Sequence, residues 1–153
     1  YQFRSAVIDF PAYLNQLELQ MDALCKTKKV HLEIQVTDIP KQITADQALL
    51  ERAIMNVLNN ALEHSPQDGT VHVNVTTHNG YVQVSIADEG NGFSPEALHH
   101  AKEQFYMADQ SRNAEMHFGM GLYIASSIVE QHGGQLILEN SAKTGGAKVT
   151  MIL

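Results

Sequence analysis

A carboxylate followed closely by two glycines ends a stretch with strand periodicity. Residues 82–87 read VQVSIA, in which every second residue is apolar. Asp88 continues the apolar parity, which predicts that its side chain points toward the buried face, just before Gly90 and Gly92 open the backbone. A buried carboxylate without a partner is costly, so a ligand amine is a natural donor for it. An ordinary turn after a strand is the alternative interpretation.

Two asparagines one turn apart lie in a stretch with helical spacing. Residues 46–64 carry an apolar stripe, and Asn56, Asn60 and Glu63 form a strip beside it. Asparagine is a mediocre helix former, so the pair needs a reason. Amide oxygens at the edge of a pocket would provide one, since a hard cation such as Mg²⁺ takes oxygen ligands. A solvated helix face is the alternative.

A third group of residues could bind an anion. Residues 117–122 read HFGMGL and precede a helix predicted over 121–131. Glycines at a helix entrance let backbone amides approach a phosphate, and the helix dipole favours the negative charge. A flexible hinge is the alternative. The chain has no GxxxxGK[ST] motif, which excludes a Walker-type loop, and no GxGxxG after a first strand, which disfavours a dinucleotide fold.

Composition limits the classes of function. With 153 residues, 44% hydrophobic and 18% charged, the sequence predicts one soluble globular domain. Its net charge of -7 disfavours a nucleic-acid partner. The single Cys25 excludes an intrachain disulfide and is expected to be a buried thiol. No apolar run approaches membrane-spanning length, so we expect no membrane contact by this chain. A start at Tyr1 suggests a piece of a longer protein.

Periodicity predicts the elements that position these residues. Strands are expected at 3–8, 30–36, 71–77, 81–87, 135–139 and 147–153, and helices at 10–28, 46–64 and 121–131. Residues 93–118 show no sustained period and are predicted to form a long functional loop. The sum is an α/β two-layer sandwich, in which about three helices cover one face of a mixed, largely antiparallel sheet.

The order of the motifs resembles the ATP-binding catalytic domain of sensor histidine kinases, in the Bergerat-fold superfamily shared with gyrase, Hsp90 and MutL ATPases. Residues 56–61 (NVLNNA) resemble its N box and residues 88–92 (DEGNG) its G1 box. Phe105 and Tyr106 resemble its F box, and residues 119–122 (GMGL) its G2 box. The resemblance covers nearly the whole chain. It implies one catalytic domain over 1–153, with an ATP lid at about 93–118.

The resemblance implies a role for each matched residue. Asp88 would accept a hydrogen bond from the adenine amino group, and Gly90 and Gly92 would let the backbone pass close to the base. Asn60 would be the Mg²⁺ ligand, with Asn56 beside it near the phosphates. The other residues expected at the nucleotide are Phe105, Tyr106, Arg112, Gly119, Gly121 and Leu122.

Four positions qualify this assignment. Lys102 and Arg112 are the cations of the expected lid, and either could meet phosphate charge or simply be solvated. Glu63 stands where such kinases often carry Lys, and His117 where a further Gly often stands. The carboxylate of Glu63 would repel a triphosphate unless it faces away or helps the metal, which predicts a modest phosphate affinity. His117 could touch a phosphate when protonated or be a simple loop residue. His99, His100 and His132 follow no metal-ligand pattern and are expected at the surface or at helix ends.

Asn56 also bears on the reaction. ATPases of the superfamily carry Glu at this position to activate water, whereas Asn is a poor base at neutral pH. The resemblance therefore implies phosphoryl transfer to a protein nucleophile, in which positioning and Mg²⁺ supply most of the catalysis. The acceptor would be a histidine on a dimerising hairpin, and none of the eight histidines here has that context. The chain should bind Mg-ATP without autophosphorylating alone.

The implied parent is a two-component sensor histidine kinase, a homodimer in the bacterial cell membrane with this domain in the cytoplasm. Its phosphate would pass to an aspartate of a response regulator. Three alternatives remain: an anti-sigma-factor serine kinase of the same fold, a non-catalytic interaction module that has lost ATP, and an ATPase. Acid stability of the phosphoprotein, nucleotide titration and phosphate release without a partner would distinguish them.

Overall fold

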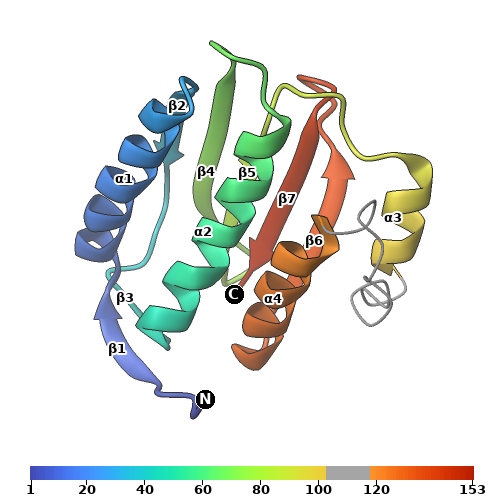
Figure 1. Cartoon of the computed structure of the whole chain (residues 1–153). Helices are drawn as coiled ribbons and strands as arrows, with labels where there is room; N and C mark the ends of the chain where they lie inside the picture. Colours follow the sequence, from blue (N-terminus) through green and yellow to red (C-terminus); the bar gives the residue numbers. More distant parts are fainter. Residues whose placement is uncertain (103–117) are drawn as a thin grey trace.

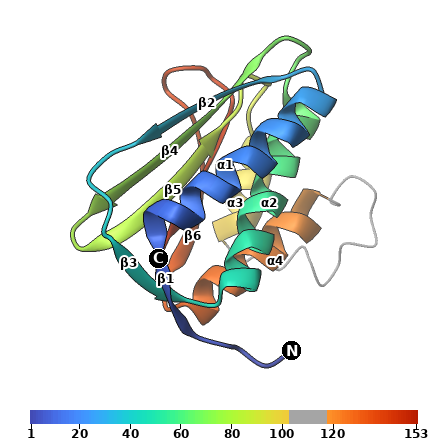
Figure 2. The same cartoon turned by 90° about the vertical axis from the view of Figure 1, so that its left-hand side faces the viewer.

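The computed structural model describes residues 1–102 and 118–153, and of these 100–102 and 118–119 by their backbone alone. A five-stranded sheet is covered on one face by a layer of helices, and a two-stranded sheet lies at one end (Figures 1 and 2). The elements in chain order are β1 (Ala6–Asp9), α1 (Phe10–Thr27), β2 (His31–Val36), β3 (Gln42–Ala45), α2 (Gln47–His64), β4 (Thr70–His78), β5 (Tyr81–Ala87), α3 (Pro95–Lys102), α4 (Phe118–Gln131), β6 (Gln135–Asn140) and β7 (Ala147–Ile152).

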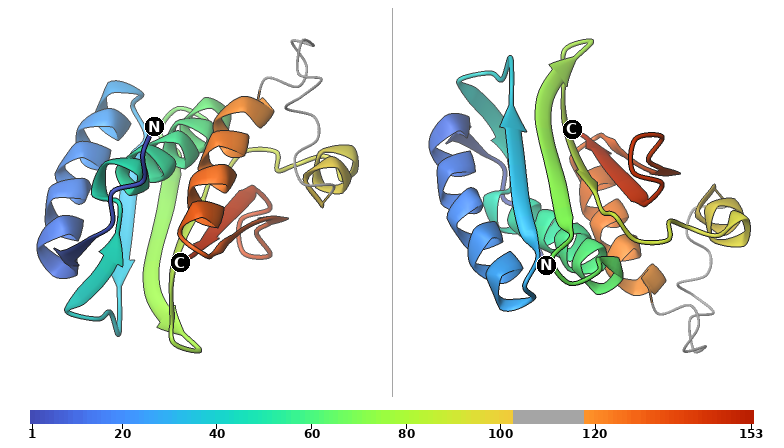
Figure 3. Two further views of the ribbon diagram at one scale, coloured as in Figure 1. Left: turned by 90° about the horizontal axis from the view of Figure 1, so that it is seen from below. Right: turned by 90° about the horizontal axis from the view of Figure 1, so that it is seen from above.

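The main sheet has the strand order β2-β4-β5-β7-β6. Strand β2 pairs with β4 in parallel, and the other neighbours are antiparallel. Helices α1, α2 and α4 lie on one face, whereas α3 stands apart from them beside β6 (Figures 1 and 3). The predicted sandwich with a mixed, largely antiparallel sheet is therefore confirmed.

The core fills the space between the sheet and these three helices. Alternate residues of β4, β5 and β7 point into it, as period-two burial predicts, and each helix contributes its apolar stripe. Cys25, on the buried side of α1, is 1% exposed, which confirms the expected buried thiol. Burial raises the pKa of Cys25 to about 11, because the thiolate loses its solvation.

Short-range signals fix several element ends. Asp9 is the N-cap of α1 and accepts a hydrogen bond from the Ala12 amide at 3.1 Å, and Pro11 lies in the first turn. The β4–β5 hairpin turns at Asn79 and Gly80, which have φ values of 54° and 82°. This is the left-handed geometry that the Asn-Gly pair predicts.

Four elements differ from the sequence prediction. The prediction of an irregular loop from residue 93 is wrong over α3, where the Ser94 hydroxyl caps the helix by accepting from the Ala97 amide at 3.1 Å. Strand β3, only four residues long, was not expected, and its partner β1 begins at Ala6 rather than at residue 3. Helix α4 begins at Phe118, so the two glycines lie inside its first turn. Strands β1 and β3 have four residues each and α3 has eight, which is too few for a periodic pattern to repeat.

Within the described parts of the chain, no helix combines the length and the apolar character needed to cross a membrane.

Candidate functional site

Asp88 occupies the first position after β5 and is 1% exposed. This confirms the predicted inward orientation. Its Oδ1 atom accepts hydrogen bonds from the Gly90 amide at 2.9 Å and from the Ala147 amide at 3.1 Å. Its Oδ2 atom is buried and has no hydrogen-bond partner among the described residues. One half of the carboxylate is thus used by the protein, and the other half remains for a donor that this part of the chain does not supply.

Two other buried side-chain oxygens in the described regions also lack a partner, the hydroxyls of Tyr13 and Thr77. A neutral hydroxyl without a partner costs less than a carboxylate oxygen, because hydrogen bonds to charged groups contribute more. The Asp88 oxygen therefore has the stronger need for a ligand donor. An exocyclic amino group such as that of adenine fits this need, because it is a pure donor.

The β6–β7 turn holds Asp88 from the other side, which local sequence patterns did not reveal. Thr144 donates its hydroxyl to the Asp88 carbonyl oxygen at 2.8 Å and accepts from the Gly146 amide at 3.1 Å. A Cβ atom on Gly146 would lie 2.6 Å from Asp88 Oδ1. The TGG run at 144–146 lies between the predicted strands 135–139 and 147–153, and its contact with Asp88 joins residues 56 or more positions apart.

The two glycines after Asp88 are required by the protein's own packing. A Cβ atom on Gly90 would collide with the carbonyl oxygen of His64, at the end of α2. Gly92 has a φ of 77°, and a Cβ there would lie 2.7 Å from the carbonyl oxygen of Gly145. The loop after β5 lies directly against α2 and against the β6–β7 turn, so only glycine fits at these two positions.

Helix α2 carries the two predicted asparagines on its half that leads to this loop. Asn60 is 6% exposed, Asn56 is half-buried, and Glu63 is exposed. Neither asparagine amide makes a hydrogen bond within 1–102 and 118–153, so both amides have free capacity in the described structure. Histidine follows at the helix end, where the Nδ1 atom of His64 lies 2.8 Å from the Asn60 carbonyl oxygen.

Helix α4 packs beside α2 (Figure 1). Its glycine-containing first turn lies next to Asn56. A Cβ on Gly121 would be 4.0 Å from the Asn56 carbonyl oxygen. The first amides of a helix have no acceptor within the helix, so this end of α4 can bind an anion. The neighbouring Leu122 is fully buried in the core. From Asn56 to His64, α2 rises by about 12 Å, so it joins the glycine end of α4 to the Asp88 loop.

Several predicted residues lie outside the described regions. These are Phe105, Tyr106, Arg112 and His117, together with the side chain of Lys102. Among the described residues, no cluster of His, Cys, Asp and Glu could hold a metal ion.

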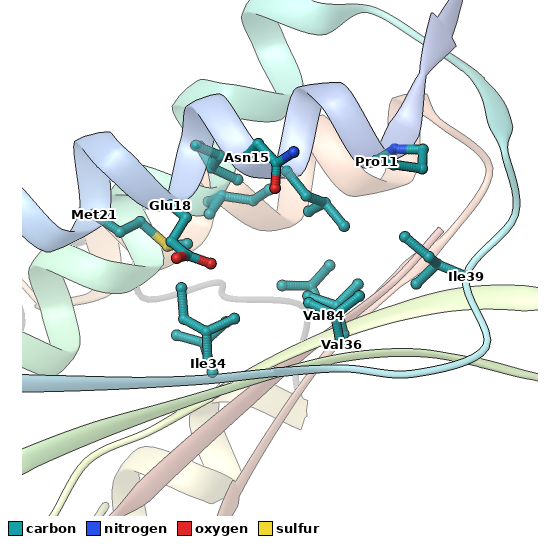
Figure 4. A pocket seen from close by; sticks show the side chains of 13 residues that line it. Pro11, Asn15, Glu18, Met21, Ile34, Val36, Ile39 and Val84 are labelled. Carbon is teal, nitrogen blue, oxygen red and sulfur yellow. The ribbon is translucent and has the colours of Figure 1, made fainter.

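A cavity of about 170 Å³ lies elsewhere, between α1 and the sheet (Figure 4). Its walls are apolar, with Asn15 and Glu18 as its polar side chains. None of the residues predicted to bind a nucleotide lines it. The apolar gap beneath α1 therefore has no part in the candidate site.

A second polar cluster, not expected from the sequence, involves Asp46 and His132. Asp46 is 2% exposed and accepts from the Arg4 amide at 2.8 Å and the Tyr1 hydroxyl at 3.0 Å. Its own amide donates to His132 Nε2 at 3.0 Å, while His132 Nδ1 lies 2.8 Å from the Ile128 carbonyl oxygen. His132 is thus more than a surface residue at a helix end. It joins α4 to the start of α2.

These bonds change the ionisation of Asp46. Burial alone would raise its pKa, but hydrogen bonds from the amides of Arg4 and Leu49 and from the Tyr1 hydroxyl lower the pKa below its ordinary value. The same contact raises the pKa of Tyr1, because its hydroxyl proton is shared with a carboxylate.

The sequence matches one family of known proteins over most of its length. Residues 45–153 match the family of histidine kinase-, DNA gyrase B-, and HSP90-like ATPases, and the chain belongs to that family. Sensor histidine kinase SpaK of Bacillus subtilis is 38% identical over 122 residues, which cover 80% of this chain and 26% of SpaK.

Solved structures agree with this assignment. A mycobacterial sensor histidine kinase, MprB, superposes with a TM-score of 0.76 at 27% identity, over 98% of this chain and 97% of that one. The catalytic domain of histidine kinase ThkA has the same fold, with a TM-score of 0.79 at 16% identity over 98% of this chain and 97% of that one. The chain is an ATP-binding catalytic domain of the sensor histidine kinase type. It spans about a quarter of the length of the curated relatives that it matches.

Proposed function

We propose that this domain binds Mg-ATP between α2, α4 and the Asp88 loop and donates the γ-phosphate to a histidine on the dimerisation hairpin of its parent sensor kinase. The observation that carries the proposal is the buried Asp88 Oδ2 atom, which has no partner among the described residues. The adenine amino group would donate to it. The base would then lie at the loop end of α2, and the triphosphate would extend along α2 toward the first turn of α4.

The phosphate end depends on Asn60, Asn56 and the amides of Gly119 and Gly121. Asn60 would bind Mg²⁺, and the metal would neutralise phosphate charge when bound. The free helix amides of α4 would hold phosphate oxygens. Glu63 is exposed, so its carboxylate need not approach the triphosphate. Phosphoryl transfer is proposed over hydrolysis because α2 offers Asn56, a poor base, near the phosphates.

The parent protein is proposed to be a homodimer in the bacterial cell membrane, with this domain in the cytoplasm. Its phosphohistidine would then supply an aspartate of a response regulator. The proposed partners are therefore the hairpin of the parent protein, which the domain contacts directly, and the response regulator, which receives the phosphate from that hairpin.

Mixing the chain with ATP labelled at the γ-phosphate and a purified hairpin segment of the parent tests the transfer. We expect the label on the hairpin only when its acceptor histidine is intact, and we expect acid to remove it. Hairpin with His→Ala is the matched control. Acid-stable label on serine would favour the serine kinase alternative, and steady phosphate release without a partner would favour an ATPase.

A further inference from the structure

Asn140, the last residue of the edge strand β6, bonds to both backbone groups of Phe93. The Phe93 amide donates to Asn140 Oδ1 at 2.7 Å, and Asn140 Nδ2 donates to the Phe93 carbonyl oxygen at 3.0 Å. A side-chain amide has one acceptor and two donors, so it pairs with a peptide group as a neighbouring strand would. This pairing joins two segments that are 47 positions apart in the sequence.

Phe93 lies between the Asp88 loop and α3. It follows the loop of residues 88–92 and precedes α3, which lies beside β6 and opens the segment expected to be the ATP lid (Figure 3). The Asn140 pairing therefore holds in place the end of the Asp88 loop (residues 88–92), where that segment begins. A loop end without such a bond samples more conformations, and ordering it on binding would cost affinity.

Gly92 shows how closely the loop fits this pairing. A Cβ atom on Gly92 would lie 2.8 Å from Asn140 Oδ1 and 2.7 Å from the Gly145 carbonyl oxygen. The β6–β7 hairpin that carries Asn140 also carries Thr144 and Ala147, which hold Asp88. One hairpin thus holds the loop at both of its ends.

We propose that Asn140 is a positioning residue for nucleotide binding, which acts through Phe93 and does not touch the nucleotide. Its amide keeps the loop end in place, so that ATP meets an ordered Asp88 loop. The inference rests on the proposed nucleotide site. It adds a residue outside the motifs of the resemblance, on a strand that those motifs do not include.

The test measures two quantities in the 153-residue chain, ATP affinity by calorimetry and hydrogen exchange of the Phe93 amide by NMR. In Asn140→Ala we expect the Phe93 amide to lose protection and the Kd for ATP to rise by about fivefold to 25-fold, the effect of one to two net hydrogen bonds. Asn74→Ala is the matched control, because Asn74 is exposed on β4 and its side-chain amide makes no hydrogen bond to the described residues. It should leave both quantities unchanged.

A purely structural role would lower stability without changing affinity in the folded fraction. Unchanged ATP affinity in folded Asn140→Ala, with the Phe93 amide exchanging freely, overturns the inference, as does continued protection of that amide. If Asn140→Ala does not fold, Asn140→Asp replaces it, since Asp keeps the acceptor and loses the donor. Its Kd should rise about fivefold, and a wild-type Kd overturns the inference. A wild-type chain that does not bind ATP overturns the proposed function and this inference together.

Discussion

At the scale of single residues, the chemistry concentrates in Asp88. One oxygen satisfies two backbone amides, and the other is buried without a partner in the described structure. The first oxygen fixes the direction of the second, since a carboxylate held at Oδ1 cannot rotate freely. The protein therefore presents one acceptor in a defined position, which is what discrimination between an amino and a keto group on a purine requires.

The glycines near the site have different physical reasons, and stability measurements can separate them. Gly90→Ala should lower the free energy of unfolding by about 1–3 kcal/mol, because the added methyl group meets the His64 carbonyl and the packing must shift. Gly121→Ala should raise it by roughly 0.5–1 kcal/mol, because Gly121 is inside α4 and has open space among its described neighbours. Urea denaturation measures both. An equal effect of the two substitutions would contradict the packing account.

At the scale of elements, capping residues define where helices begin. Asp9→Ala should lower the free energy of unfolding by about 1 kcal/mol, because the Ala12 amide at the start of α1 loses its acceptor. Gln20→Ala, on the exposed face of the same helix, should change it by less than about 0.5 kcal/mol. Thermal and urea unfolding measure the difference, and equal values for the two variants would exclude the capping role.

Elements also show how far the sequence could predict the structure. The parity of β5 predicted the burial of Asp88, and the 3.6-residue period predicted α1 and α2, because these segments are long enough for a pattern to repeat. Strand β3 and helix α3 have four and eight residues, too few for such a pattern. The bonds from Thr144, Ala147 and Asn140 to the Asp88 loop could not be predicted, since they depend on tertiary contacts between distant segments.

At the scale of the whole molecule, a buried polar cluster connects segments that are far apart in the sequence. Asp46 and His132 join the segment before β1 to α2 and to the end of α4, whose first turn lies at the proposed phosphate site. Helix α4 thus has its first turn at the proposed phosphate site and its other end at the Asp46–His132 cluster. Periodicity gave no sign of this connection, because Asp46 was only the first residue of the predicted helix 46–64 and His132 was expected at the surface or at a helix end.

The Asp46 cluster predicts a pH dependence of stability. The folded-state pKa of Asp46 is lowered, so its contribution is fully present above the unfolded value of about 3.9 and is lost as the pH falls through the folded value. Asp46→Asn should therefore lower the melting temperature most near neutral pH, with a difference from wild type that shrinks below about pH 4. Asp38→Asn, at an exposed carboxyl, is the control. A difference that stays constant with pH would disprove the role of the Asp46 charge.

The claim that Asp88 recognises adenine is tested most directly by the affinity for ATP, measured by calorimetry in wild type, Asp88→Asn and Asp38→Asn. Asparagine keeps the Oδ1 acceptor for the two backbone amides and replaces the unpaired oxygen by a donor. We predict at least about a tenfold weaker Kd for ATP in Asp88→Asn, the loss of one hydrogen bond to a charged group, and no change in Asp38→Asn. Equal ATP affinity of Asp88→Asn and wild type, with both folded, would contradict the account.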